Sequence, residues 1–153
     1  MQETHDMLLV TIPWADLDTP RVAPALLKGI AESHGFSIKT LDLNIDFKYK
    51  ICDNNDKTYA DKQDYFISVA DRPDKDIQRF YDLALDVISK EKFVYLGISV
   101  FSVYTHRATY ELCKALRQRM PTVKIVLGGR GLNVKPHLSI NQYLNEQEKR
   151  IPF

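Results

Sequence analysis

Three short segments of the chain carry the residue types from which a ligand site could be built, because they combine hydroxyl, carboxylate, aromatic and glycine residues. Each segment lies at the end of an apolar run that is typical of a buried strand. The segments are residues 13–19, 99–105 and 128–131. For the residues in each of them, a structural role stands beside the functional one.

Gly128 and Gly129 remove two side chains from the end of a predicted strand. A flat ligand or a phosphate could therefore approach the backbone closely, although a tight strand-to-helix turn explains a glycine pair equally well. No G-x-G-x-x-G pattern follows the first predicted strand, and the sequence has no phosphate-binding loop of the Walker type. The sequence therefore argues against a nicotinamide dinucleotide site.

Ser99, Phe101, Ser102 and Tyr104 give the second segment short hydroxyls and aromatic walls. Such a lining suits an aromatic heterocycle that is held by one or two polar contacts. In the alternative interpretation, Ser99 bonds to the backbone and Phe101 fills the core. The residue types leave both interpretations open.

Asp16 and Asp18 in the first segment could bind a cation or a polar ligand, but aspartates ahead of a helix more often cap it. The four histidines are scattered and form no metal-ligand pair. Cys113 lies on an apolar helical stripe, as a small core residue would. The sequence shows no nucleophile elbow, so we do not expect the chain to be catalytic on its own.

The apolar pattern predicts the elements that position these segments. Strands alternate with helices of about ten to fifteen residues, which predicts a mostly parallel sheet with helices on both faces. Buried strands are expected at 7–12, 93–100 and 123–127, a half-exposed edge strand at 36–47, helices at 20–34, 77–90, 106–120 and 136–149, and a polar excursion at 48–76 with weak helical content around 65–69.

Ligands of open parallel sheets bind outside the carboxyl ends of the strands, where the strand order reverses. If the order is 2-1-3-4, the reversal lies between the first and third predicted strands. The three segments would then converge at one edge of the sheet.

Composition sets the broad class of the protein. The 153 residues suit one domain, so we expect residues 1–153 to fold together. Lysine and arginine number 21 against 20 acidic residues, which lacks the basic excess of proteins that bind nucleic acid or anionic membranes. The most apolar stretch, 93–104, is shorter than the roughly 20 residues of a membrane helix. With no signal-peptide pattern and only two cysteines, a cytoplasmic chain with reduced thiols is expected.

Five short pieces occur in an order and spacing that point to a known family. They are residues 13–14 (PW), 24–35 (beginning PALL and ending in glycine), 41–44 (LDLN), 96–102 (LGISVFS) and 125–129 (IVLGG). Across about residues 8–132 the chain resembles the N-terminal cobalamin (vitamin B12)-binding-type domain of cobalamin-dependent radical SAM proteins. The resemblance implies a flavodoxin-like (Rossmann-like) three-layer α/β/α fold. Its mostly parallel sheet would have four strands in the order 2-1-3-4 and would lack the usual fifth strand.

The resemblance also implies a corrinoid at the carboxyl edge of the sheet. By similarity, Ser99 and Ser102 would line the pocket for its nucleotide tail, and Gly128 and Gly129 would allow the tail to approach closely. Together with the loop residues described above, the expected cofactor-binding residues are Pro13, Trp14, Asp16, Asp18, Ser99, Phe101, Ser102, Tyr104, Gly128 and Gly129.

Two departures from the family pattern stand out. The D-x-H-x-x-G motif is missing, since Asp18 and Arg21 occupy its histidine and glycine positions. A bound cobalamin would therefore have no histidine ligand from this loop. The family also continues into a fifth strand and a barrel with a three-cysteine iron–sulfur motif, whereas two cysteines cannot hold a cluster here. The chain would be a fragment or a free-standing module, and its fourth strand could support self-association through the sheet edge.

The resemblance implies a module that presents a corrinoid to a radical SAM catalytic domain or subunit absent from this chain. The alternative is a ligand-free scaffold of the same fold that is used for protein–protein contact. A phospho-receiver is disfavoured, because it needs an aspartate at the end of the third strand, where Ser99 stands.

Overall fold

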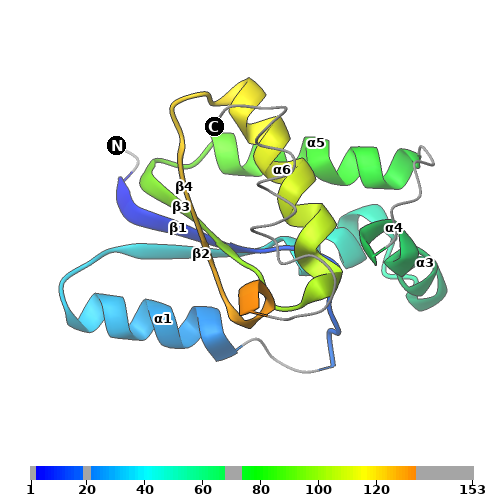
Figure 1. Ribbon diagram of the computed structural model, residues 1–153, viewed down its shortest axis with the longest axis horizontal. Helices are drawn as coiled ribbons and strands as arrows, with labels where there is room; N and C mark the ends of the chain where they lie inside the picture. The colour runs from blue at the N-terminus through cyan, green and yellow to red at the C-terminus, as the bar shows by residue number, and fades with distance from the viewer. Residues whose placement is uncertain (1–2, 19–21, 68–73, 134–153) are drawn as a thin grey trace.

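The computed structural model describes residues 3–18, 22–67 and 74–133. Its centre is a sheet of four parallel strands in the order β2-β1-β3-β4 (Figure 1). The strands are β1 (His5–Thr11), β2 (Ile38–Asp42), β3 (Phe93–Ser99) and β4 (Lys124–Gly128). The predicted order is confirmed, and the fold is a flavodoxin-like α/β fold. The helix predicted at 136–149 lies outside the described residues.

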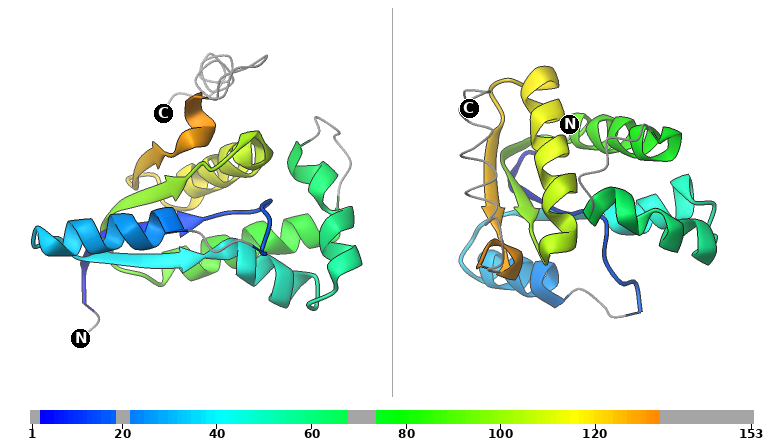
Figure 2. Two further views of the ribbon diagram at one scale, coloured as in Figure 1. Left: turned by 90° about the horizontal axis from the view of Figure 1, so that it is seen from below. Right: turned by 45° about the vertical axis from the view of Figure 1, so that its right-hand side comes forward.

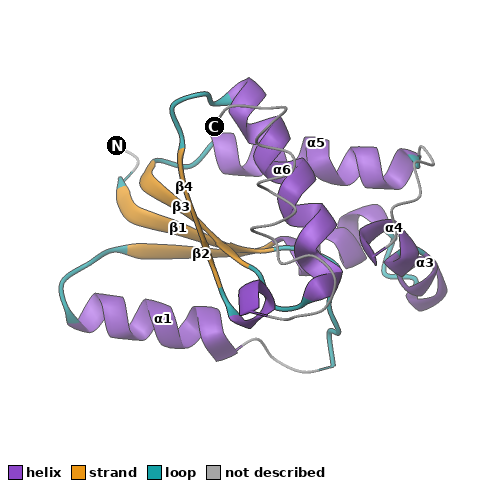
Figure 3. Cartoon of the chain, in the orientation of Figure 1, coloured by secondary structure: helices purple, strands orange, loops and turns teal. Residues whose placement is uncertain are grey.

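Helices pack on both faces of the sheet (Figures 1 and 2). One long helix, α1 (Val22–Ser33), lies on one face, and α5 (Lys75–Ser89) and α6 (His106–Arg119) lie on the other. Figure 3 shows the shorter helices grouped beyond the end of β2 and around the strand ends. These are α2 (Leu43–Asp46), the π-helix η1 (Phe47–Ile51), α3 (Asp56–Asp61), α4 (Gln63–Ile67) and the 3-10 turns η2 (Val103–Thr105) and η3 (Arg130–Asn133).

The alternation of side chains along β1 assigns its residues to the two faces. Leu8 and Val10 are fully buried and join the hydrophobic core with side chains of α5 and α6; we call this side the core face. Met7, Leu9 and Thr11 point to the opposite side, which we call the α1 face. Helices therefore lie on both faces of the sheet, as the sequence predicts, with α1 as the one long described helix on the α1 face.

The prediction of a strand at 36–47 is wrong for the second half of that segment. β2 ends at Asp42, whose Oδ1 accepts hydrogen bonds from the backbone N–H groups of Asn44 and Ile45 at 3.0 and 3.1 Å. This side chain caps α2, so the backbone turns into a helix where the alternating pattern predicts continued extension. Leu43 and Phe47, four residues apart, then share one buried helical side.

The excursion at 48–76 is more ordered than its polar composition predicts. It contains η1, α3 and α4, and its aromatic side chains enter the main core. The ring of Phe47 lies 5.3 Å from that of Phe66 and 5.4 Å from that of Phe80 on α5, both in edge-to-face arrangement. Such pairs add to the stability that apolar burial gives. The described part of the excursion therefore shares the hydrophobic core of the domain.

An ion-pair cluster joins the end of α3 to the start of α5. Lys62 Nζ lies 2.6 Å from Asp74 Oδ2 and 2.9 Å from Asp76 Oδ2, and the side chains of Lys62 and Asp74 are only 15% and 11% exposed. Burial opposes the charged form of Asp74, but the hydrogen bonds from Lys62 and from the backbone N–H of Ile77 outweigh it and lower the pKa of this carboxyl group.

Replacing Asp74 by Asn tests this cluster. The amide oxygen can still cap α5, but the charge is lost. Because the pKa of Asp74 is lowered by folding, its contribution to stability is present above about pH 4 and is lost as the pH falls through the folded-state pKa. We expect Asp74→Asn to lower the free energy of unfolding at pH 7, and this difference to shrink in urea titrations toward pH 2.

The matched control is Asp61→Asn, since Asp61 pairs with Lys57 on the exposed surface of α3. An exposed pair contributes little to stability, so this variant should track the wild type across the pH range. If Asp74→Asn lowered the free energy of unfolding by the same amount at pH 7 and at pH 2, the result would contradict a stabilising role for the negative charge of Asp74.

Thr11 at the end of β1 carries a buried hydroxyl without a hydrogen-bond partner in the described part of the chain, and its side chain is only 5% exposed. A buried hydroxyl that makes no hydrogen bond is destabilising. Thr11→Val keeps the shape and removes the hydroxyl, so we expect the free energy of unfolding in urea to rise by about 1 kcal/mol.

Thr109 provides the comparison, because its fully buried hydroxyl donates a 2.7 Å hydrogen bond to the Thr105 carbonyl. Thr109→Val should therefore lower the free energy of unfolding by about 1 kcal/mol. A Thr11→Val protein that is also destabilised would show that the Thr11 hydroxyl has a partner.

Candidate functional site

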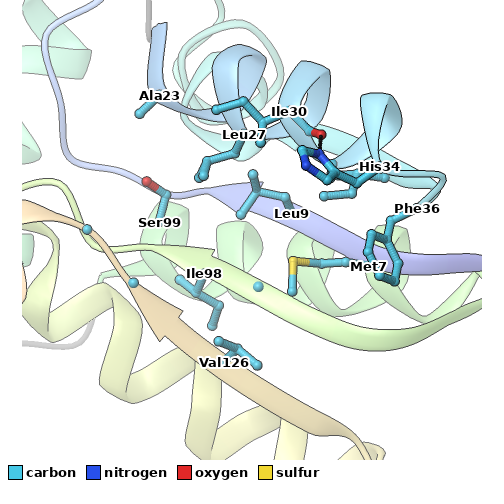
Figure 4. Close-up of a pocket in the computed structure, with 15 residues that line it drawn as sticks. Met7, Leu9, Ala23, Leu27, Ile30, His34, Phe36, Ile98, Ser99 and Val126 are labelled. Atoms are coloured by element: carbon cyan, nitrogen blue, oxygen red, sulfur yellow. Dashed lines mark hydrogen bonds between the residues drawn. The ribbon is translucent and has the colours of Figure 1, made fainter.

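The α1 face of the sheet carries an apolar groove of about 730 Å³ (Figure 4). In Figure 4, Leu27 from α1 and Leu9 and Met7 from β1 point into the space between the helix and the sheet, and Val126 borders it from β4. The groove exists because α1 packs beside β1 and β2. The residues that line it are Met7, Leu9, Ala23, Leu27, Ile30, Ala31, His34, Phe36, Ile38, Gly97, Ile98, Ser99, Val126, Gly128 and Gly129.

The strands that floor this groove are less buried than their apolar sequences predict. Tyr95 of β3 is 41% exposed and Val126 of β4 is 43% exposed, and both are on the α1 face by their pairing with Met7 and Gly97. The prediction that 93–100 and 123–127 are buried on both faces is therefore wrong for the α1 face. An apolar run shows that a strand is apolar on both sides, but it does not show how many helices cover it.

Two glycines shape the floor of the groove. A Cβ on Gly97 would meet Met7 Sδ at 2.9 Å and Leu9 Cδ1 at 3.0 Å, so its absence lets these side chains lie across β3. A Cβ on Gly128 would meet no described atom within 4 Å. Gly128 therefore leaves an open position at the carboxyl end of the groove, where a ligand could approach the backbone.

The polar end of the groove lies in one row across the sheet. Thr11 pairs with Ser99, and Ser99 pairs with Gly128, so these residues share one level at the carboxyl edge. The Ser99 side chain lines the groove, and Figure 4 shows its hydroxyl directed toward α1 near Ala23. The groove thus combines apolar walls with one hydroxyl at the edge where ligands of parallel sheets bind.

Segments 99–105 and 128–131 meet, as the sequence predicts. Val100 N donates to the Gly128 carbonyl at 2.7 Å, and Gly131 N donates to the Val100 carbonyl at 2.8 Å. His106 Nε2 lies 2.9 Å from the Gly131 carbonyl oxygen, so this histidine holds η3 against the start of α6. These contacts fix the carboxyl end of the groove.

Gly129 has a structural role of its own. Its φ is +119°, and a Cβ there would lie 2.5 Å from the Val100 carbonyl oxygen. Gly131 is equally constrained, with a Cβ position 2.7 Å from Ser102 N. The turn interpretation of the glycine pair is thus confirmed for Gly129, whereas Gly128 faces open space.

The first segment takes a different direction from the other two. Trp14 stacks on Tyr59 of α3 with ring centroids 5.3 Å apart, and its Nε1 donates to the Tyr59 carbonyl at 3.2 Å. The Ala15 carbonyl accepts hydrogen bonds from Asn44 Nδ2 and the Tyr59 hydroxyl. Trp14 therefore sits against the α2–α3 region, and neither Trp14 nor the buried Pro13 lines the groove.

The remaining predicted residues lie around the groove or away from it. Asp16 Oδ1 accepts a hydrogen bond from Asp18 N at 2.9 Å, and both side chains are solvent-exposed. Phe101 is 54% exposed, so the alternative in which it fills the core is wrong. Ser102 Oγ accepts from Tyr104 N at 3.3 Å at the start of η2, and neither of these two residues lines the groove.

Most of the groove was not identified from the sequence. Its walls come from α1 and from the α1-face residues of β1 and β4. In the sequence these residues belong to apolar runs, which predict positions in the hydrophobic core. The signal that could have located them is the alternation along β1, which places Met7, Leu9 and Thr11 opposite the core residues. The order of strands then puts Gly97 and Val126 on the same face.

The reactive side chains of the described residues do not point to covalent or metal chemistry. Burial raises the pKa of Cys113 to about 12 and that of Cys52 to about 11, which makes both thiols poor nucleophiles. No group of three histidine, cysteine or carboxylate side chains in the described part of the chain is arranged to hold a metal ion.

Within the same residues, we find no helix with the length and apolarity to cross a bilayer.

Comparisons of the chain with models of protein families, with curated proteins and with solved structures yield no match. The resemblance to cobalamin-binding-type domains therefore stays a prediction.

The two glycines of the pair should respond differently to substitution. Gly129→Ala forces a Cβ against the Val100 carbonyl at a positive φ, so we expect it to lower the free energy of unfolding by about 1–3 kcal/mol. Gly128→Ala meets no described atom and should change it by less than about 0.5 kcal/mol. Thermal unfolding followed by circular dichroism measures both. Equal losses in the two variants would show that Gly128 is also constrained.

Proposed function

We propose that this chain binds a corrinoid and presents it at the carboxyl edge of the sheet to a catalytic domain or subunit. The observation that carries the proposal is the apolar groove between α1 and the sheet, which ends at Ser99 and Gly128. The residue resemblance to cobalamin-binding-type domains supports the choice of ligand, and it suggests a radical SAM protein as the partner.

The residues present suit the nucleotide tail of such a ligand. An aromatic base needs an apolar slot, which Leu9, Leu27 and Met7 provide. The sugar and phosphate are polar and would lie at the carboxyl end, where Ser99 Oγ can donate a hydrogen bond. The open position at Gly128 is a space that any larger side chain would fill.

The protein would supply position and environment, and the cofactor would supply the chemistry. A bound corrinoid carries a methyl group or electrons on its cobalt. The described residues of the first segment, 13–18, contain no histidine, and His106 already contacts the Gly131 carbonyl. We therefore propose binding without a histidine ligand from the first segment or from His106, with the exposed rings of Phe101 and Tyr104 beside the corrin at the carboxyl edge.

The second candidate function is a ligand-free scaffold for protein–protein contact. It is favoured by the exposure of apolar side chains on α1, such as Leu26 at 58% and Leu27 at 51%. Large exposed apolar patches mark interaction sites on soluble proteins. Cofactor retention separates the two candidates, because only the first requires a ligand in the groove.

The test is incubation of the purified protein with hydroxocobalamin, desalting, and measurement of the corrinoid absorbance that stays with the protein. We expect the wild type to retain the corrinoid. Gly128→Leu should lower the affinity at least about tenfold, because the new side chain occupies the groove and overpacking costs about 1–3 kcal/mol.

The control for this variant is Gly29→Leu. It makes the same chemical change at a position with no described atom within 4 Å, on α1 but outside the groove. Retention by Gly29→Leu and loss by Gly128→Leu would support the proposal. A wild type that emerges colourless from desalting, or a Gly128→Leu protein that binds normally, would rule out this use of the groove.

A further inference from the structure

Helix α1 is apolar over a wider arc than its contact with the sheet requires. Pro24 is its one buried residue, whereas Val22, Leu26 and Ile30 are 68%, 58% and 50% exposed. At 3.6 residues per turn, these three side chains follow one line along the helix. A surface helix ordinarily presents polar residues there, so this line of α1 has the composition of an interface.

The sheet beside α1 has a matching apolar surface. On the α1 face, Tyr95 and Val126 are 41% and 43% exposed, and Phe36 at the end of the groove is 58% exposed. Parallel sheets are normally covered on both faces. Among the described residues, α1 is the one long helix on this face, and it packs beside β1 and β2, so no described helix covers β3 and β4 there.

We propose that α1 of a second copy of this chain occupies that position. A two-fold axis running between the two helices and parallel to them places each α1 over β3 and β4 of the other copy. The two α1 helices then lie side by side between two sheets. The same surface is used on both copies, as a closed two-fold interface requires.

The distribution of residues around α1 fits this arrangement. Val22 and Leu26 do not line the chain's own groove and would contact β3 and β4 of the second copy. Leu27 and Ile30 border the groove and would contact the other α1 helix. Lys28 and Glu32 form an ion pair with each other and line a separate cleft on the β2 side of α1, so these charges would stay at the rim.

The exposed apolar surface is of sufficient size. Seven large side chains of this face are 41–68% exposed, and together they approach the roughly 800 Å² per partner that a standard interface buries. They are Val22, Leu26, Leu27, Ile30, Phe36, Tyr95 and Val126. A second copy that covered all seven side chains would bury an area toward the lower end of the range for a stable dimer.

This arrangement bears on ligand binding, a step that rests on the proposed function. The helix of the second copy lies over the groove that we assign to the corrinoid tail, so the two occupants exclude each other. Binding of the cofactor would separate the copies, and the carboxyl edge would become available to the catalytic partner. Measurements of the oligomeric state and of cofactor binding therefore both report which of the two occupants covers the α1-face groove.

The first experiment measures the molar mass of the full chain by size-exclusion chromatography with light scattering, without cofactor and over a range of concentrations. We expect a dimer of twice 17.7 kDa. Leu26→Glu places a charge in the interface and should weaken the dimer at least roughly thirtyfold, as expected for a central interface residue. Ala25→Glu lies on the β2 side of α1 and should leave the dimer intact.

The second experiment adds hydroxocobalamin to the wild type and to Leu26→Glu. We expect the wild-type dimer to shift to monomer and the variant to bind the corrinoid as a monomer. A dimer that persists with the corrinoid bound would overturn the competition between the two occupants.

Each failure is distinguishable. A wild type that is monomeric at every concentration, or a dimer that Leu26→Glu does not weaken, would overturn the proposed interface whether or not cofactor binds. A dimer sensitive to Leu26→Glu in a protein that never retains the corrinoid would support the interface and remove the proposed function.

Discussion

Side chains alternate between the two faces of each parallel strand, and this alternation decides which surfaces of the sheet helices must cover. Each strand has two faces, and both must be kept from water when both are apolar. α5 and α6 satisfy this requirement on the core face, where Leu8 and Val10 are fully buried. On the α1 face one long helix of the described chain packs beside β1 and β2. The groove, the exposed apolar residues and both proposals follow from this imbalance.

The carboxyl edge is built by backbone contacts more than by side chains. Val100 exchanges hydrogen bonds with the ends of β4 and η3, and Gly129 and Gly131 permit this approach because a Cβ at either position would collide with the neighbouring loop. These backbone contacts hold the end of β4 and η3 against the segment that follows β3, at the carboxyl end of the groove. Gly128, one residue before it, is unconstrained by the fold and remains available to a ligand.

The alternation of strands and helices was sufficient to predict a parallel sheet, and the strand order that we assumed and that the family resemblance implied is confirmed. The meeting of segments 99–105 and 128–131 follows from that order, because β3 and β4 are neighbours. The sequence was insufficient at Asp42, where one side-chain hydrogen-bond acceptor ends the strand that the apolar pattern continues. It also missed the cluster of Phe47, Phe66 and Phe80, whose members are far apart in the chain and follow no period. The groove was missed for a third reason, since an apolar run does not reveal which of its faces is left without a helix.

The two buried cysteines make it possible to measure local opening of the fold by thiol labelling. Cys52 follows η1 and Cys113 lies in the middle of α6, and both are almost fully shielded from solvent with strongly raised pKa values. A thiol reagent can reach them only when the surrounding packing separates. The two labelling rates would therefore record how often the packing around Cys52 in the η1 region and around Cys113 on α6 opens.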